Sequence, residues 1–199
     1  MKWFLKNRFS FVCVLLGVVL LLVAGAVMLV DGVSAKQSEK DAAQILEKTQ
    51  TMMPQSMDRV PEERGNNTMA SMEIDGVNVI GVLSFTGYGR TLPLAGSWDT
   101  GLVSSMPCRF TGSIYDESLI IGAVDGENQL PFAARMEVGD QIVLTDMEGG
   151  RYTYRVSAIH HARSATLEKL QEGDYPLTIF VKDSNTSEYL LIRCQIGGR

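Results

Sequence analysis

The feature that most constrains this chain is an uninterrupted apolar run from Phe9 to Val30. The run carries no charge, and its only hydroxyl side chain is Ser10. As a helix rising about 1.5 Å per residue it would measure roughly 33 Å, enough to cross a bilayer core of about 30 Å. Three basic residues precede it within residues 1–8, and Asp31 follows it. The positive-inside rule therefore predicts a cytoplasmic N-terminus and an extracellular body.

A cleaved secretory signal is the alternative interpretation of this segment. Such a signal has an apolar region of about 7–15 residues followed by a small-residue cleavage site. The run is longer than that, although Val33-Ser34-Ala35 would suit cleavage. We therefore expect an uncleaved single-pass anchor in the cell membrane, with a cytoplasmic tail over residues 1–8 and a transmembrane helix over residues 9–30.

The remainder of the sequence is acidic. The whole chain has 18 Lys and Arg against 23 Asp and Glu, a formal net charge of −5. Because residues 1–30 hold three of the basic residues and no acidic one, residues 31–199 carry a net charge of −8. An acidic body argues against nucleic acid as a partner. The hydrophobic fraction of 45% excludes a disordered chain.

Residues 31–73 are expected to lead into the outer domain as a helix and a linker. The segment 36–50 is rich in strong helix formers, and we interpret it as a stalk or as a packing helix at the entrance of the domain. A weak apolar stripe on this helix is formed by Ala42, Ile45 and Leu46. Proline and turn residues then mark a linker over Thr51–Asn67.

From residue 74 to residue 199 the chain has the pattern of short strands separated by Gly and Asp turns. The predicted strands are Val77–Phe85, Ser118–Ile121, Gln141–Thr145, Arg151–Ile159, Leu177–Val181 and Glu188–Ile196. A short helix is predicted over Thr166–Gln171. Many strands with few helices indicate one mostly β domain, either a closed barrel or a sandwich.

Several motifs in this domain follow one another in a specific order and spacing. They are Ile80–Leu83, Leu92–Leu94 with Trp98, Pro107–Tyr115, Val138–Asp146, Gly150–Val156, Leu177–Phe180 and Leu191–Cys194. Together they resemble the sortases, the membrane-anchored cysteine transpeptidases of Gram-positive bacteria, and most closely the class B-like sortases of Firmicutes. The resemblance covers roughly residues 74–196 and the N-terminal anchor. It implies an eight-stranded β-barrel with short helices, preceded by one transmembrane helix.

The resemblance also implies which positions would carry the chemistry. Sortases use a nucleophilic cysteine, a histidine that protonates the leaving amine, and an arginine that steadies the substrate and the oxyanion. The histidine position, after Ile121-Gly122-Ala123, is Val124 in this chain. The cysteine position, at the end of Leu177–Lys182, is Lys182, and the arginine position seven residues later is Tyr189. All three catalytic side chains are thus expected to be replaced.

The residues at these positions lack the properties that transpeptidation needs. Val124 has no proton to transfer. Lys182, with a reference pKa of about 10.4, is mostly protonated, and an amide formed on it would not turn over. Tyr189 could donate a hydrogen bond to an oxyanion but brings no fixed charge. We therefore predict a pseudoenzyme whose peptide groove is lined by Val124, Val181, Lys182 and Tyr189. In this groove Lys182 could pair with a carboxylate of a ligand or with a neighbouring acid such as Asp183 or Glu188. Alternatively, Lys182 is a solvated loop lysine.

Other reactive side chains have more ordinary interpretations. Cys108 and Cys194 could form a disulfide in the oxidising exterior, remain buried thiols, or act as nucleophiles. His160 and His161 are adjacent in the sequence and would point to opposite faces of a strand, which argues against a metal site. No cofactor is expected.

Three function classes follow from these sequence features. The first is an inactive peptide-binding or accessory module in the anchoring of cell-surface proteins or pili. The second is a divergent active sortase, a transpeptidase or hydrolase that uses non-standard residues. The third is a structural accessory of pilus or cell-wall assembly that acts through its surface or its membrane helix. The expected partners are the membrane, sorting-signal peptides, pilin or surface proteins, or an active sortase.

Overall fold

The chain forms two compact units, Met1–Ser38 and Glu39–Arg199. The computed structural model describes residues 16–21, 39–59, 68–126, 129–183 and 186–197. In the first unit, residues 16–21 are helical and exposed. Within the described ranges, no helix is both long enough and apolar enough to cross a membrane. Most of the transmembrane helix predicted over residues 9–30 lies outside these ranges.

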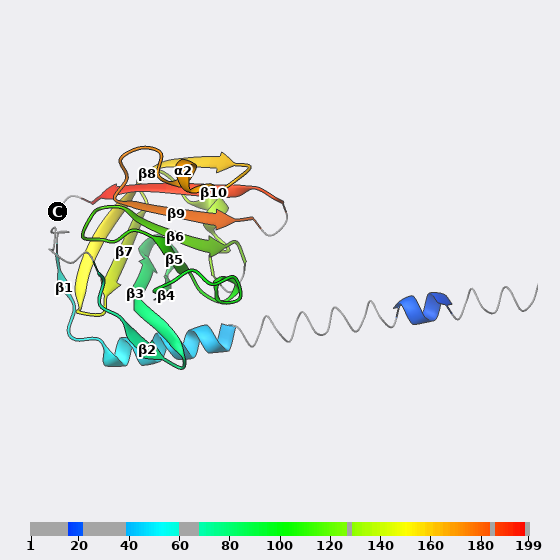
Figure 1. The fold of residues 1–199 in the computed structure, drawn as a ribbon, viewed down its shortest axis with the longest axis horizontal. Coiled ribbons are helices and arrows are strands. Elements are labelled where there is room, and N and C mark those ends of the chain that lie inside the picture. Colours follow the sequence, from blue (N-terminus) through cyan, green and yellow to red (C-terminus); the bar gives the residue numbers. More distant parts are fainter. Residues whose placement is uncertain (1–15, 22–38, 60–67, 127–128, 184–185, 198–199) are drawn as a thin grey trace, which may run out of the picture. The chain divides into compact units, whose positions relative to one another are not determined.

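The strand pairings of the second unit close eight strands into a barrel, and Figure 1 shows how these strands are arranged. The strands are β3 (Val77–Phe85), β4 (Arg90–Ala95), β5 (Cys108–Thr111), β6 (Leu119–Val124), β7 (Gln141–Asp146), β8 (Gly150–Ala162), β9 (Leu177–Lys182) and β10 (Tyr189–Ile196). Neighbours follow the order β3-β4-β5-β6-β9-β10-β8-β7, and β7 pairs again with β3, which closes the sheet. Because the sheet closes on itself, the domain is a barrel and not a sandwich.

Besides the helix over residues 39–52, the described part of the unit has two short strands and four short helices. They are β1 (Met57–Asp58), β2 (Met72–Ile74), η1 (Thr86–Tyr88), η2 (Leu102–Ser104), η3 (Ala133–Arg135) and α2 (Leu167–Leu170). Strand β1 pairs with the start of β8, and β2 pairs with the start of β3. The helix predicted over Thr166–Gln171 is present as α2, with the bounds Leu167–Leu170.

The barrel interior follows from the alternation of side chains along each strand. In β8, Tyr152, Tyr154 and Val156 are buried, whereas the residues between them are partly or fully exposed. This is the period-two pattern of a strand with one face on the core. The same interior cluster contains Phe85, Leu94, Ile121, Leu144, Ile179 and Ile192, all fully buried.

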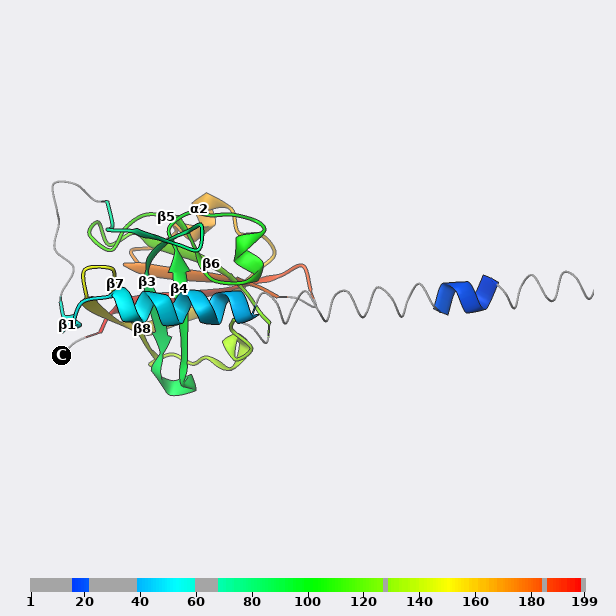
Figure 2. The same ribbon diagram turned by 90° about the horizontal axis from the view of Figure 1, so that it is seen from below.

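A helix over residues 39–52 packs on the outside of the barrel, across β3 and β4 (Figure 2). Ala42 and Ile45 are each 4% exposed and join a second apolar cluster with Val79 and Ala95. Of the two interpretations of this segment, the structure thus supports the packing helix. The compact unit consequently begins at Glu39, earlier than the boundary expected at residue 74.

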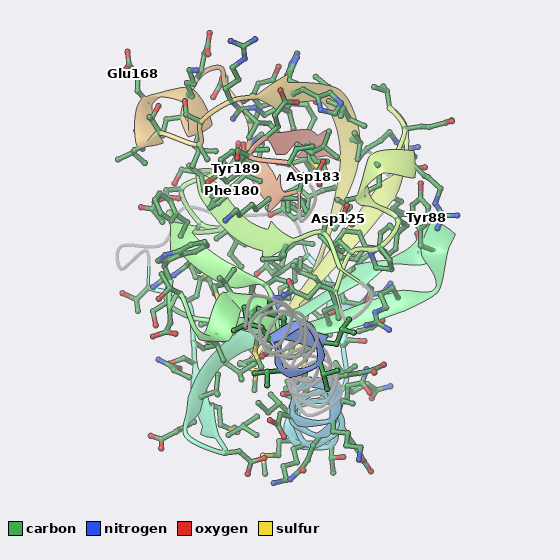
Figure 3. All side chains as sticks on the ribbon, turned by 90° about the vertical axis from the view of Figure 1, so that its right-hand side faces the viewer. Tyr88, Asp125, Glu168, Phe180, Asp183 and Tyr189 are labelled. Carbon is green, nitrogen blue, oxygen red and sulfur yellow. The ribbon has the colours of Figure 1, made fainter. Side chains whose placement is uncertain are left out.

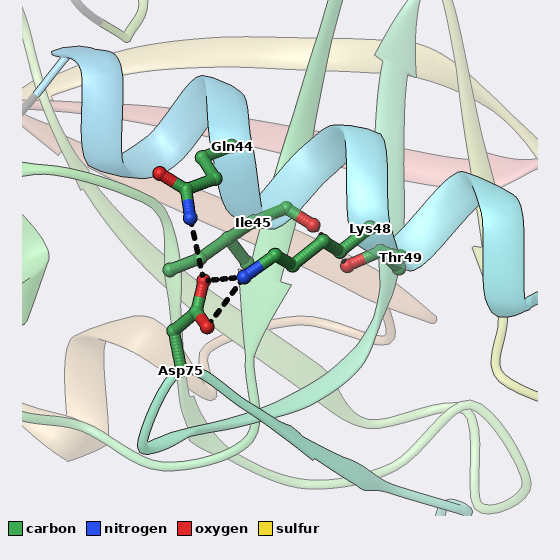
Figure 4. A network of polar contacts seen from close by, with 5 residues as sticks. All are labelled: Gln44, Ile45, Lys48, Thr49 and Asp75. Atoms are coloured by element: carbon green, nitrogen blue, oxygen red, sulfur yellow. Dashed lines mark hydrogen bonds and ion pairs between the residues drawn. The ribbon is translucent and has the colours of Figure 1, made fainter.

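Polar contacts hold the same helix to the turn between β2 and β3 (Figure 4). The ammonium of Lys48 lies 2.6 Å from a carboxylate oxygen of Asp75, and the Gln44 amide donates to the same carboxylate at 3.4 Å. The buried Thr49 hydroxyl donates to the carbonyl of Ile45 at 2.6 Å. Because Lys48 and Asp75 are both exposed, we expect the apolar contacts to contribute most of the stability of this attachment.

Candidate ligand-binding site

The three positions that the resemblance matches to catalytic residues lie side by side at one end of the barrel. Strands β6 and β9 are parallel, and their register pairs Val124 with Lys182. Strands β9 and β10 are antiparallel, and their register pairs Lys182 with Tyr189. The three residues form one row across neighbouring strands, with a step of about 4.8 Å. Paired residues share a face of a sheet, so this row lies on one side of the barrel wall.

Val181, the fourth predicted groove residue, has a different place from the row. It precedes Lys182 in β9, so its side chain points to the opposite face of the sheet. It is 1% exposed and belongs to the interior cluster. Val181 therefore lies on the interior side of the barrel wall, where it lines part of a small pocket.

Lys182 presents a positive charge at the end of β9. Its side chain is exposed, and its ammonium makes no hydrogen bond or ion pair with any residue that the structure describes. Neither Asp183 nor Glu188 forms an ion pair with it, and the backbone N–H of Asp183 donates to the carbonyl of Glu188 at 3.1 Å. The ammonium is thus available to a carboxylate on a ligand.

A small pocket of about 40 Å³ lies next to the row and is lined by acidic groups. Asp125, Asp183, Glu188, His161 and Tyr189 contribute to it, and Figure 3 shows Asp125, Asp183 and Tyr189 gathered at this end of the barrel. Burial, and secondly the charge of Asp183, raises the pKa of Asp125. Among the described residues, no three His, Cys, Asp or Glu side chains are arranged to hold a metal ion.

His161 is a site residue that the sequence patterns do not reveal. Strand β8 runs to Ala162, three residues past its predicted end at Ile159, and its register pairs His161 with Leu190 of β10. This pairing places His161 on the same face as Leu190 and Val181, and all three line the small pocket. Only the continuation of period-two alternation past Ile159 could have indicated it.

A largely buried aromatic cluster extends from the row along the outer face of the barrel, with Phe180 4% exposed. The rings of Trp98, Phe110 and Phe180 lie 5.4–5.5 Å apart, and the Tyr189 ring lies 6.3 Å from that of Phe180. Phe180 is two residues before Lys182 and therefore shares its face. Trp98 is 37% exposed. Trp98 therefore offers the accessible ring surface of the cluster on the face that carries Lys182.

Neither of the outer cysteines contributes to this site. Cys108 and Cys194 are free thiols that are 0% exposed. Burial raises the pKa of Cys108 to about 11 and that of Cys194 to about 12, so both remain protonated near neutrality. A protonated, buried thiol is a poor nucleophile.

The fold also keeps these two cysteines too far apart for a disulfide. Cys108 lies on β5 in the outer apolar cluster, and Cys194 lies on β10 in the barrel interior. Strands β6 and β9 separate β5 from β10. Three inter-strand steps of about 4.8 Å place the two Cα atoms well beyond the roughly 7 Å that a disulfide can bridge.

Comparison with known proteins identifies the fold. No family model matches the sequence, and no curated protein does. Solved structures of sortases do match with probability 1.00. Sortase C1 from Streptococcus agalactiae is 20% identical, with a TM-score of 0.53 over 63% of this chain and 71% of that one. Sortase A from Corynebacterium diphtheriae, a lid mutant, is 19% identical, with a TM-score of 0.51 over 61% and 71%.

A third similar structure was determined with a peptide motif. Clostridium perfringens sortase C, with the C-terminal cell wall sorting motif, is 18% identical, with a TM-score of 0.52 over 61% of this chain and 71% of that one. A sortase D5 from the same species also matches. At these identities the likeness concerns the fold, and the finer resemblance to class B remains a prediction. The second unit of this chain, Glu39–Arg199, has a sortase-like β-barrel fold.

Proposed function

We propose that this chain is a cell-surface module that binds an extended peptide on the outer face of β6, β9 and β10 without cleaving it. The single observation that carries the proposal is the row of Val124, Lys182 and Tyr189 beside the aromatic cluster, in which Trp98 is open to solvent. The apolar run over residues 9–30 would anchor the module in the cell membrane, with the barrel outside.

Binding is supported by the chemistry of this face. Aromatic rings provide apolar area at a low cost in side-chain entropy, and Trp98 keeps part of its surface open to a ligand. Lys182 can pair with a peptide carboxylate because no described residue neutralises it. The C. perfringens sortase C of similar fold was solved with a sorting motif, which makes such a peptide the first ligand to test.

The absence of cleavage is supported by what the described part of the row contains. Acyl transfer needs a nucleophile, a proton shuttle and stabilisation of the oxyanion. Val124 supplies neither a nucleophile nor a proton, and the two outer thiols are buried elsewhere. His161 is near Tyr189, but a histidine without a nucleophile does not form an acyl enzyme.

A peptide titration tests both parts of the proposal. The full-length chain in detergent micelles is titrated by calorimetry with a peptide carrying a cell wall sorting motif, and the peptide is then analysed by mass spectrometry. Saturable binding of an uncleaved peptide is expected. Lys182→Gln should weaken binding, whereas Lys40→Gln, which removes an exposed charge from the helix over residues 39–52, should not.

Two outcomes would overturn the proposal. Absence of binding at millimolar peptide would exclude the peptide-binding role and leave a structural accessory. Cleavage of the peptide that is lost on substitution of Cys108 or Cys194 by Ala would instead establish a divergent enzyme.

A further inference from the structure

We propose that a second, basic cavity between β8, β10 and the segment around α2 binds a phosphate-bearing ligand. The cavity has a volume of about 590 Å³ and lies where α2 packs beside β8 and β10 (Figure 1). Ligand sites typically occupy about 300–1,000 Å³. None of Val124, Lys182 and Tyr189 lines this cavity, although His161 lines both it and the small pocket.

The cavity concentrates positive charge on an acidic domain. Among its described lining residues, the basic side chains are His160, His161, Arg163, Lys169 and Arg193, and the only acidic one is Glu172. Residues 31–199 carry a net charge of −8. No carboxylate of the described residues forms an ion pair with any of the three Arg and Lys side chains. Glu172 acts on Arg193 at longer range, so one carboxylate faces the three cations of the cavity.

Arg193 gives the cavity a built, buried cation. Its side chain is 4% exposed, and its guanidinium donates to the carbonyls of Lys169 and Leu170 and to the hydroxyl of Thr178 at 3.0 Å. The Tyr175 ring centroid lies 5.3 Å from the guanidinium carbon. These contacts fix the plane of the group against the 163–175 segment.

The hydrogen bonds of Arg193 are incomplete. A guanidinium has five N–H donors, and its partners among the described residues take three of them. Burial also lowers the pKa of Arg193, and the charges of Tyr175 and Glu172 oppose this effect only in part. Burying a cation with neutral acceptors alone is costly. An oxyanion in the cavity would supply both a counter-charge and acceptors.

A phosphate group matches this donor set better than a carboxylate. The Arg193 guanidinium of β10, the Lys169 ammonium of α2 and the His160 imidazole of β8 come from different elements, which suits a tetrahedral group with several acceptor oxygens. The cavity is also larger than one phosphate, so it leaves room for the organic part of a phosphate ester. The inference is therefore a phosphate ester or diphosphate rather than a simple halide or carboxylate.

Calorimetric titration of the full-length chain in micelles with pyrophosphate tests this inference, with citrate as the carboxylate comparison. Saturable binding of pyrophosphate, stronger than that of citrate, is expected. Arg163 and Lys169 are exposed, so Arg163→Gln and Lys169→Gln should not disturb folding. Together they should weaken the affinity for pyrophosphate about tenfold or more. Lys40→Gln is the matched control, and Lys182→Gln should leave pyrophosphate binding unchanged.

Three results would overturn the inference. The first is no binding of pyrophosphate at millimolar concentration to the folded protein. The second is an equal loss of affinity in Lys40→Gln, which would indicate unspecific attraction. The third is tighter binding of citrate than of pyrophosphate, which would assign the cavity to carboxylates.

Discussion

Gly122 of β6 lies directly beneath the indole ring of Trp98, so closely that a β-carbon at this position would overlap the ring. The same β-carbon would lie 2.5 Å from the Phe180 ring. The absence of a side chain at residue 122 therefore allows the aromatic cluster to close over the strand. This contact links the backbone of β6 to the face on which we propose that a peptide binds.

Gly122→Ala should displace this cluster. Overpacking of a close contact typically costs about 1–3 kcal/mol, and we expect a loss of that size in the free energy of unfolding. Gly87→Ala is the control, because a β-carbon there meets nothing within 4 Å. Urea unfolding of the two variants measures the difference. Equal stabilities would show that Trp98 does not pack on β6.

The helix over residues 39–52 provides a second prediction. Ile45→Ala removes a side chain that is 4% exposed and should cost about 2–4 kcal/mol of stability. Lys48→Ala removes an exposed ion pair with Asp75 and should cost less than about 1 kcal/mol. Denaturant unfolding compares the two. A larger effect of Lys48→Ala would mean that the helix is held electrostatically rather than by burial.

Arg193 should hold the 163–175 segment on the barrel. Arg193→Met leaves two backbone carbonyls and the Thr178 hydroxyl without their donor, and each unsatisfied buried group costs about 1–3 kcal/mol. In Arg193→Met, hydrogen exchange in this segment should become faster than in the unsubstituted protein, whereas exchange in β3 should stay the same. Mass spectrometry measures both. Unchanged exchange at Lys169 and Leu170 would contradict this role.

The buried thiols and phenols predict a loss of stability at alkaline pH. Burial raises the pKa of Cys108 from 9.0 to about 11 and that of Cys194 from 9.0 to about 12, and burial with the Asp140 hydrogen bond raises that of Tyr88 from 10.0 to about 12. A raised folded pKa favours the protonated form in the native state. This stability is complete below pH 9 and is lost as pH rises through the folded values.

Two measurements check this alkaline prediction. The free energy of unfolding should fall progressively between pH 9 and pH 12. At neutral pH, site-resolved mass spectrometry should find Cys108 and Cys194 unreactive toward iodoacetamide until the chain is unfolded. Rapid labelling of either thiol in the native protein would favour the divergent enzyme.

The sequence predicts the strands whose local pattern is strong. The predicted strand Val77–Phe85 is β3 without any shift, and alternation in the Tyr152–Val156 stretch locates β8. Strand β4 contains Pro93, which lacks an N–H and weakens a strand pattern, and β5 has only four residues. The two-residue strand β1 exists only because it pairs with β8.

The candidate site was partly predictable, because some of its residues belong to local sequence motifs. Val124, Lys182 and Tyr189 follow from motif spacing, and the register of β6, β9 and β10 places them in one row. His161 and Trp98 join them through strand pairing and a loop contact that span many residues of sequence. Such long-range contacts leave no local pattern, so they become visible only in the folded chain.

The position at which a peptide binds tests the central claim most directly. Isotopically labelled full-length chain in micelles is titrated with a sorting-motif peptide, and backbone amide shifts are followed by NMR. We predict that the largest shifts occur at Val124, Lys182 and Tyr189 and at the Trp98 indole, with none at Lys40. Largest shifts elsewhere on the barrel, or no shifts at millimolar peptide, would contradict peptide binding on this face.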